Sequence, residues 1–224
     1  MEMTEMTDTY KNSVTAPNET PEEREYEFRA HIGSIWTGGR LAIGMSTFLY
    51  ASEAFAYFYL RTSNNSNLWR LPGQLAPLYY GWTVLICLLL MAGLAIYGHR
   101  RLKRGFTTDF LVAGWTGVGA GLIALFFQIW ELVVLPFYPG SSGYASTFMG
   151  FVVMNIGTII FATYWMETTV ARVLRMRKEL GGTTPELSSA HTARSFRANV
   201  SSMAYYMGFV AIVSIMFFLM FYVA

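Results

Sequence analysis

Five polar side chains lie inside stretches of sequence that are otherwise apolar, and their types could support chemistry. Glu53 lies in one stretch, and Gln128 and Glu131 lie in another. Residues three apart share a helix face, and Asn155 and Thr158 repeat that spacing in a third stretch. A charge at membrane depth is costly without a partner. These residues therefore predict either a polar site between helices, for lipid headgroups or protons, or hydrogen bonding between helices. For each residue alone we favour the second interpretation.

The side chains that usually hold a cofactor are scarce in these apolar stretches. The three histidines, His31, His99 and His191, fall outside them, and Cys87 is the single cysteine. A membrane haem normally needs axial ligands such as histidine, and copper typically needs several histidines or paired cysteines. We therefore expect no catalytic residue, no metal ligand and no cofactor of this chain's own.

The elements that position these residues are predicted to be membrane-spanning helices. The chain has 224 residues, of which 54% are hydrophobic and 13% charged, against about 25% charged in soluble domains. Apolar runs near the roughly 20 residues that span hydrocarbon recur along the chain. Five are expected, at about 41–60, 76–98, 110–135, 145–166 and 203–224. The predicted fold is an all-α, polytopic membrane helix bundle over 36–224, preceded by a polar, largely extended cytoplasmic arm at 1–35.

Lysine and arginine predict the orientation of the bundle, because they gather in cytoplasmic loops. The loop between the second and third runs carries Arg100, Arg101, Lys103 and Arg104, and the loop after the fourth run is also basic. With five spans, both loops face the cytoplasm only if the N-terminus is cytoplasmic and the C-terminus outside. The net charge of +2 is too small to predict a nucleic-acid partner.

Small residues repeat every four positions in the third run, at Ala113, Gly117 and Gly121. Such a ridge allows a neighbouring helix to approach closely. It indicates helix packing and carries no chemistry.

Four segments together resemble subunit III of the haem–copper (cytochrome c) oxidase family. ALFFQIWEL, which holds Gln128 and Glu131, resembles the family's FxxGQxxEY. ASEAFAYFYLR resembles SE…AYFxLR, YASTFMGFVVMNIGTIIF resembles SxFYxxTGFHGLHVxxG, and YYMGFVAIVSIMFF resembles YYWHFVDxVWIxLF. The matches cover about 41–224 in the family's order.

The chain also departs from the family pattern at polar positions. The two family histidines of the fourth span fall on Asn155 and Thr158, and the histidine and aspartate of the last span fall on Gly208 and Ala211. Either Glu53 replaces the family carboxylate of the first span, or Ser46 holds the aligned position.

The resemblance implies a divergent five-helix subunit III of a bacterial cytochrome c oxidase, a proton-translocating oxidoreductase of aerobic respiration. Such a subunit is non-catalytic. It stabilises subunit I, lies near subunit II, binds phospholipid and supports proton uptake in the inner membrane. Haem and copper belong to its partners, and membership of a supercomplex is left open. The alternatives are an accessory subunit of a quinol oxidase or nitric oxide reductase, or a small transporter, against which the lack of an evident repeat counts.

Overall fold

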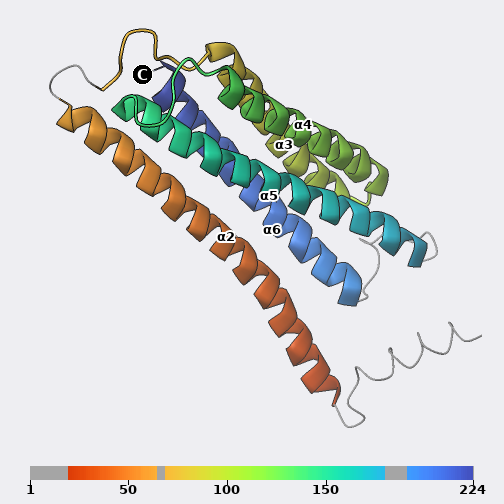
Figure 1. Cartoon of the computed structure of the whole chain (residues 1–224). Helices are drawn as coiled ribbons and strands as arrows, with labels where there is room; N and C mark the ends of the chain where they lie inside the picture. Colours follow the sequence, from red (N-terminus) through yellow and green to blue (C-terminus); the bar gives the residue numbers. More distant parts are fainter. Residues whose placement is uncertain (1–19, 65–68, 180–190, 224) are drawn as a thin grey trace, which may run out of the picture.

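The computed structural model describes residues 20–64, 69–179 and 191–223, and nearly all of them are helical (Figure 1). The described part of the chain contains no strand. The elements are α2 (Pro21–Ser63), α3 (Leu78–Lys103), α4 (Thr107–Val134), α5 (Gly143–Glu179), α6 (His191–Phe218) and a terminal π-helical turn, η1 (Leu219–Val223). The predicted all-helical fold is confirmed.

Four helical segments of the described chain are long and apolar enough to cross a membrane. They are Leu78–Lys103, Thr107–Val134, Gly143–Met176 and Ala193–Val223. They cover all but at most two residues of each of the second to fifth predicted runs, so the chain is a multi-pass membrane protein. The first run lies in α2, which has 43 residues but is not among the four. Glu53 and several hydroxyl-bearing residues make its 41–60 portion less apolar.

The helices form an up-and-down bundle in which consecutive helices run in opposite directions (Figure 1). α3 packs against α4 and α6, α4 also packs against α5, and α2 packs against α5 and α6. This arrangement places the ends of α4 and α6, the start of α5 and the end of α2 at one end of the bundle. The basic ends of α3 and α5 lie at the other.

The start of α2 is fixed by a capping box at Thr20. The Thr20 side chain accepts a hydrogen bond of 3.3 Å from the Glu23 backbone N–H, and the Glu23 carboxylate accepts one of 2.7 Å from the Thr20 N–H. Pro21 follows at the first helical position, where its fixed φ favours a helix. Residues 21–35, predicted as part of a largely extended arm, are therefore helical and continuous with the first apolar run. Residues 1–19 of that arm lie outside the described residues.

The first turns of α2 are tied to the start of α6 by Arg194. Its guanidinium lies 3.5 Å from the Glu25 carboxylate and 4.5 Å from the centre of the Phe28 ring. The hydrogen bond from Arg29, and after it the contact with Arg194, holds the pKa of the Glu25 carboxyl below its ordinary value. These contacts hold the N-terminal end of α2 against the bundle.

The core has an aliphatic part and an aromatic part. The aliphatic part lies between α3, α4, α5 and α6 and includes fully buried Leu88, Met91 and Met203. The aromatic part lies at the end of the bundle away from the basic loops, where the Phe148 and Phe221 rings meet edge to face among other rings. The polar side chains singled out from the sequence lie between and beside these two parts.

Candidate functional site

Gln128 and Glu131 lie on the inward face of α4 and begin a buried hydrogen-bonded cluster. Gln128 is 1% exposed and Glu131 is fully buried. The Gln128 amide donates a hydrogen bond of 2.7 Å to Glu131 Oε2. The spacing of three residues that the sequence shows thus brings both side chains to one face.

Asn155 of α5 extends this cluster to a second helix, and Tyr50 of α2 extends it to a third. The Asn155 amide donates a hydrogen bond of 2.7 Å to Gln128 Oε1. The Tyr50 hydroxyl lies 3.1 Å from Asn155 Oδ1 and 3.0 Å from Thr158 Oγ1. Gln128, Glu131, Asn155 and Thr158, four of the five polar residues predicted from the sequence, are therefore joined in one cluster.

Tyr222 of η1 closes the other end of the cluster. Its hydroxyl donates to the Glu131 carboxyl, 2.7 Å from Oε1 and 2.9 Å from Oε2. The Tyr222 ring lies directly on Gly81 of α3, where a Cβ would come within 2.6 Å of two ring carbons. Gly81 is therefore required by the close approach of the ring, because any larger residue would displace it.

Two further tyrosines hold the C-terminal turn that carries Tyr222. The Tyr57 hydroxyl donates to the Met220 carbonyl at 2.9 Å, and the Tyr144 hydroxyl donates to the Phe221 carbonyl at 2.8 Å. The last carbonyls of a helix lack partners within the helix and are costly to bury unpaired. Here side chains of α2 and α5 satisfy them, which fixes the position of Tyr222 opposite Glu131.

A cavity of about 20 Å³ lies beside the cluster. Its polar lining comes from Gln128, Asn155, Ser214 and Tyr222, and the rest of its wall is apolar. A space of this size accommodates about one water molecule, which needs two to four polar partners. The cluster is thus surrounded by packed side chains and has no room for a larger ligand.

The chemistry of the cluster favours holding helices together over moving protons. A proton relay needs atoms that both accept and donate, whereas a carboxamide accepts at oxygen and donates at nitrogen. Asn155 and Gln128 meet amide to amide, and they separate Tyr50 from Glu131. No lysine, arginine or histidine of the described residues forms an ion pair with Glu131. Its carboxyl is held instead by two donors, the Gln128 amide and the Tyr222 hydroxyl.

Glu53 does not join the cluster. It is partly buried on α2, and its Oε1 is buried without a hydrogen-bond partner. Its carboxyl packs on Gly150 of α5, where an added Cβ would lie 3.0 Å from Oε2. The structure thus pairs the Gln128–Glu131 face of α4 with Asn155 and separates it from Glu53.

The small-residue ridge of α4 lies at the contacts with α3 and α5. Ala113, Gly117 and Gly121 are all buried. A Cβ at Gly117 would lie 2.4 Å from Met166 Cε, and one at Gly121 would lie 2.3 Å from Thr163 Oγ1. This close approach of α4 and α5 brings Gln128 within hydrogen-bond distance of Asn155.

Tyr50 and Tyr222 belong to the cluster although the sequence did not single them out. The chain has 14 tyrosines, and tyrosine is common at membrane interfaces, so neither position is distinctive. Within the described residues, no group of three or more histidine, cysteine, aspartate or glutamate side chains is arranged to hold a metal ion.

No protein-family model matches this chain, and no curated protein matches it in sequence.

Proposed function

We propose that this chain is a non-catalytic, subunit III-like subunit of a bacterial haem–copper oxidase, most simply a cytochrome c oxidase, in the inner membrane. Its role is to pack against the subunit that carries the haem and copper centres and to stabilise it during turnover. Oxygen reduction and electron transfer take place in the partner subunits.

One observation carries this proposal. Gln128 and Glu131, the residues of the best-kept family motif, are hydrogen-bonded to each other, and Gln128 also accepts a hydrogen bond from Asn155, which occupies a position where the family has histidine. The polar residues of the resembling segments are thus used to bind helices to one another. This use supports a scaffolding role for the chain.

The proposal includes α2 as a fifth span. Met45, Phe48 and Phe55 are exposed apolar residues on α2 and need lipid or a partner subunit around them. A fifth span gives the orientation expected from the basic loops, with the N-terminus cytoplasmic and the C-terminus outside. The cluster around Glu131 then lies in the outer half of the membrane.

The face of α4 that points away from the bundle offers a surface for the main partner. Phe126, Ile129, Trp130 and Val133 are exposed there, on the side of the helix opposite Gln128 and Glu131. The Phe126 and Trp130 rings stack with centroids 6.0 Å apart, which forms a flat aromatic surface. Aromatic residues are enriched at interfaces between subunits.

The decisive experiment is co-purification in mild detergent. The chain should be expressed at native level with a C-terminal affinity tag, and the captured proteins should be identified by mass spectrometry. We expect a larger haem-containing subunit and a spectrum of reduced haem in the same fraction. Oxygen-uptake assays with reduced cytochrome c and with a quinol then separate a cytochrome c oxidase from a quinol oxidase.

Two results would overturn the proposal. In the first, the chain purifies without any haem protein, from membranes whose oxidases remain intact. In the second, the purified chain alone carries solute flux after reconstitution, which would favour a small transporter.

A further inference from the structure

Two depressions of the bundle surface meet towards its basic end. One, of about 640 Å³, lies between α2 and α6, and the other, of about 690 Å³, lies between the end of α3 and α6. Trp36 and Tyr205 line both, and the centres of their rings lie 5.8 Å apart. We call the two depressions together the basic groove.

The basic groove carries positive charge without acidic neighbours. Arg40 of α2 lines the first depression, and His99, Arg100 and Lys103 of α3 line the second. No acidic residue lines either depression. Among the described residues, Arg40, Arg100 and Lys103 form no ion pair. The described part of the chain therefore supplies no counter-charge for the groove.

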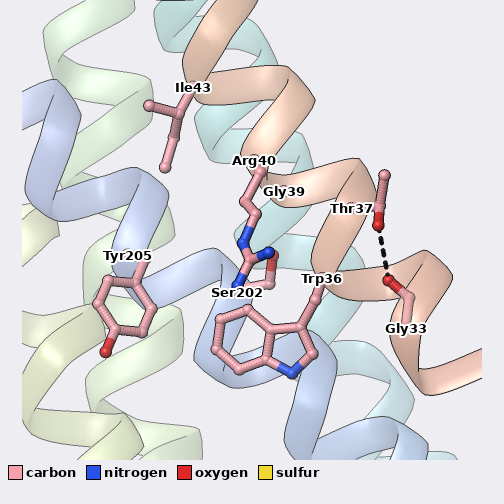
Figure 2. Close-up of a pocket in the computed structure, with 8 residues that line it drawn as sticks. All are labelled: Gly33, Trp36, Thr37, Gly39, Arg40, Ile43, Ser202 and Tyr205. Atoms are coloured by element: carbon pink, nitrogen blue, oxygen red, sulfur yellow. Dashed lines mark hydrogen bonds between the residues drawn. The ribbon is translucent and has the colours of Figure 1, made fainter. Parts of the chain in front are cut away.

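A buried hydroxyl without an acceptor lines the first depression. Ser202 of α6 is 1% exposed, and its Oγ has no hydrogen-bond partner among the described residues. Figure 2 shows the Arg40 side chain reaching from α2 towards Ser202. A buried hydrogen-bonding group is costly to leave unpaired. The hydroxyl and the guanidinium together indicate that an acceptor, such as a carboxylate, belongs at this place.

The rest of the groove wall is largely apolar. Ile96, Phe209 and Ile212 line the second depression, and Ile43 lines the first. A segment that fits the groove should therefore combine acidic side chains with apolar ones.

The first ten residues of this chain have that composition. They read MEMTEMTDTY, in which acidic side chains are interspersed with large apolar ones, namely Glu2, Glu5 and Asp8 with Met3, Met6 and Tyr10. The first basic side chain is that of Lys11. Residues 1–10 thus offer both the carboxylates and the apolar side chains that the groove calls for.

These residues are attached at the correct end of the bundle. They precede α2, which begins at Pro21, at the same end as the basic residues of α3 (Figure 1). From Pro21 the helix rises about 22 Å to Trp36, at about 1.5 Å per residue. A chain as long as residues 1–19 can span up to about 60 Å. The segment can therefore reach the groove, and its attachment to α2 keeps its effective concentration there high.

We propose that the basic groove is the docking site of residues 1–10 of this chain, with the three carboxylates among the basic side chains and the methionines and tyrosine on the apolar wall. In the described bundle α2 packs against α5 and α6. The docked segment adds a link from α2 to the end of α3 and covers the groove. The proposal goes beyond the proposed function and does not depend on any oxidase partner.

Disulfide crosslinking in the full chain tests the docking. In a Cys87→Ala background, Thr4→Cys places a thiol in the segment and Ser201→Cys places one in the wall of the second depression. The protein is oxidised in mild detergent with whatever subunits co-purify, and the disulfide is followed by mass spectrometry of its peptides. We expect it to form about fivefold faster than in the control below, since several partly exposed charge pairs hold the segment in place.

The control pair is Thr4→Cys with Thr168→Cys on α5. Thr169, the next residue, accepts a hydrogen bond of 3.1 Å from Asn199 of α6, so position 168 lies at about the same level of the bundle as Ser201. Thr168 does not line the groove. A tether that merely keeps the segment near the bundle should crosslink both positions at similar rates.

A second comparison tests the role of charge. Glu2→Gln/Glu5→Gln should lower the rate at position 201 to that of the control pair, and salt at about 0.5 M should do the same, because exposed charges are screened. Glu22→Gln/Glu27→Gln removes two exposed carboxylates of α2 and should leave the rate unchanged.

A photo-crosslinker in place of Tyr205, which is 67% exposed, identifies the occupant in a chain that is otherwise native. We expect it to capture the tryptic peptide that ends at Lys11. Capture of a lipid or of another subunit instead would overturn the proposal. Equal disulfide rates at positions 201 and 168, or equal effects of the two glutamine double variants, would also overturn it. None of these outcomes bears on the co-purification that tests the proposed function.

Discussion

The Asn155 amide nitrogen lies 2.7 Å from the Gln128 amide oxygen, and both side chains are buried between α4 and α5. Because lipid offers no competing donors or acceptors, each partner depends on the other. The bond is the second of four in a chain of hydrogen bonds that runs from Tyr50 on α2 to Tyr222 on η1. It fixes the rotation of α4 relative to α5.

Replacing Glu131 with alanine should lower the stability of the chain and leave the initial rate of oxygen uptake in the proposed complex nearly unchanged. The change leaves the Tyr222 hydroxyl and the Gln128 amide without their shared acceptor, at a cost of about 1–3 kcal/mol for each unsatisfied group. The unfolding midpoint in detergent should fall, and Glu131→Gln should lower it less. In the proposed complex, oxygen uptake should start normally and decline over many turnovers, with parallel loss of the subunit. A collapse of initial turnover while the subunit stays bound would show that Glu131 takes part in the chemistry.

Tyr50→Phe should loosen the attachment of α2. The change removes the hydroxyl that reaches Asn155 and Thr158 but keeps the ring, which lies 5.1 Å from Phe217. We expect a loss of about 1–3 kcal/mol, with faster proteolysis in the loop after Ser63. Tyr59→Phe is the matched control, because Tyr59 is exposed on the same helix. Equal effects of the two changes would contradict the role given to Tyr50.

Gly121→Ala should separate α4 from α5. The new Cβ would lie 2.3 Å from Thr163 Oγ1 and 3.1 Å from Met91 Sδ, and threonine in a helix has little freedom to move. Overpacking of this kind costs about 1–3 kcal/mol. On the same helix, Gly119 has no atom within 4 Å of an added Cβ, so Gly119→Ala should be neutral or stabilising by up to about 1 kcal/mol. An unfolding midpoint that is the same for both variants would contradict the close α4–α5 contact.

Cysteine labelling tests the orientation. In a Cys87→Ala background, Tyr138→Cys lies in the exposed loop before α5 and Arg104→Cys lies in the exposed turn after α3. An impermeant thiol reagent added outside intact cells should label position 138 only. Labelling of position 104 alone would reverse the orientation. Equal labelling would show that α4 does not cross the membrane, which contradicts the proposed five spans.

The sequence predicted most residues of the candidate site but not their hydrogen-bond partners on other helices. The spacing of Gln128 with Glu131, and of Asn155 with Thr158, is local, and helix geometry alone places each pair on one face. Whether the α4 pair faces Asn155 or Glu53 depends on the rotation of three helices, which no local pattern contains. The resemblance to subunit III stays a proposal, because it rests on short motifs in order.

The sequence by itself determined that the chain is helical and membrane-spanning, because hydropathy and run length act within each segment. It also determined which residues are costly in a membrane and therefore need partners. The tertiary structure alone decided those partners. Tyr50 of α2 and Tyr222 of η1 meet the same cluster, and the Trp36 ring of α2 lies 5.8 Å from the Tyr205 ring of α6. Such contacts depend on how closely neighbouring helices pack and where they cross, which are properties of the assembled bundle rather than of any one helix.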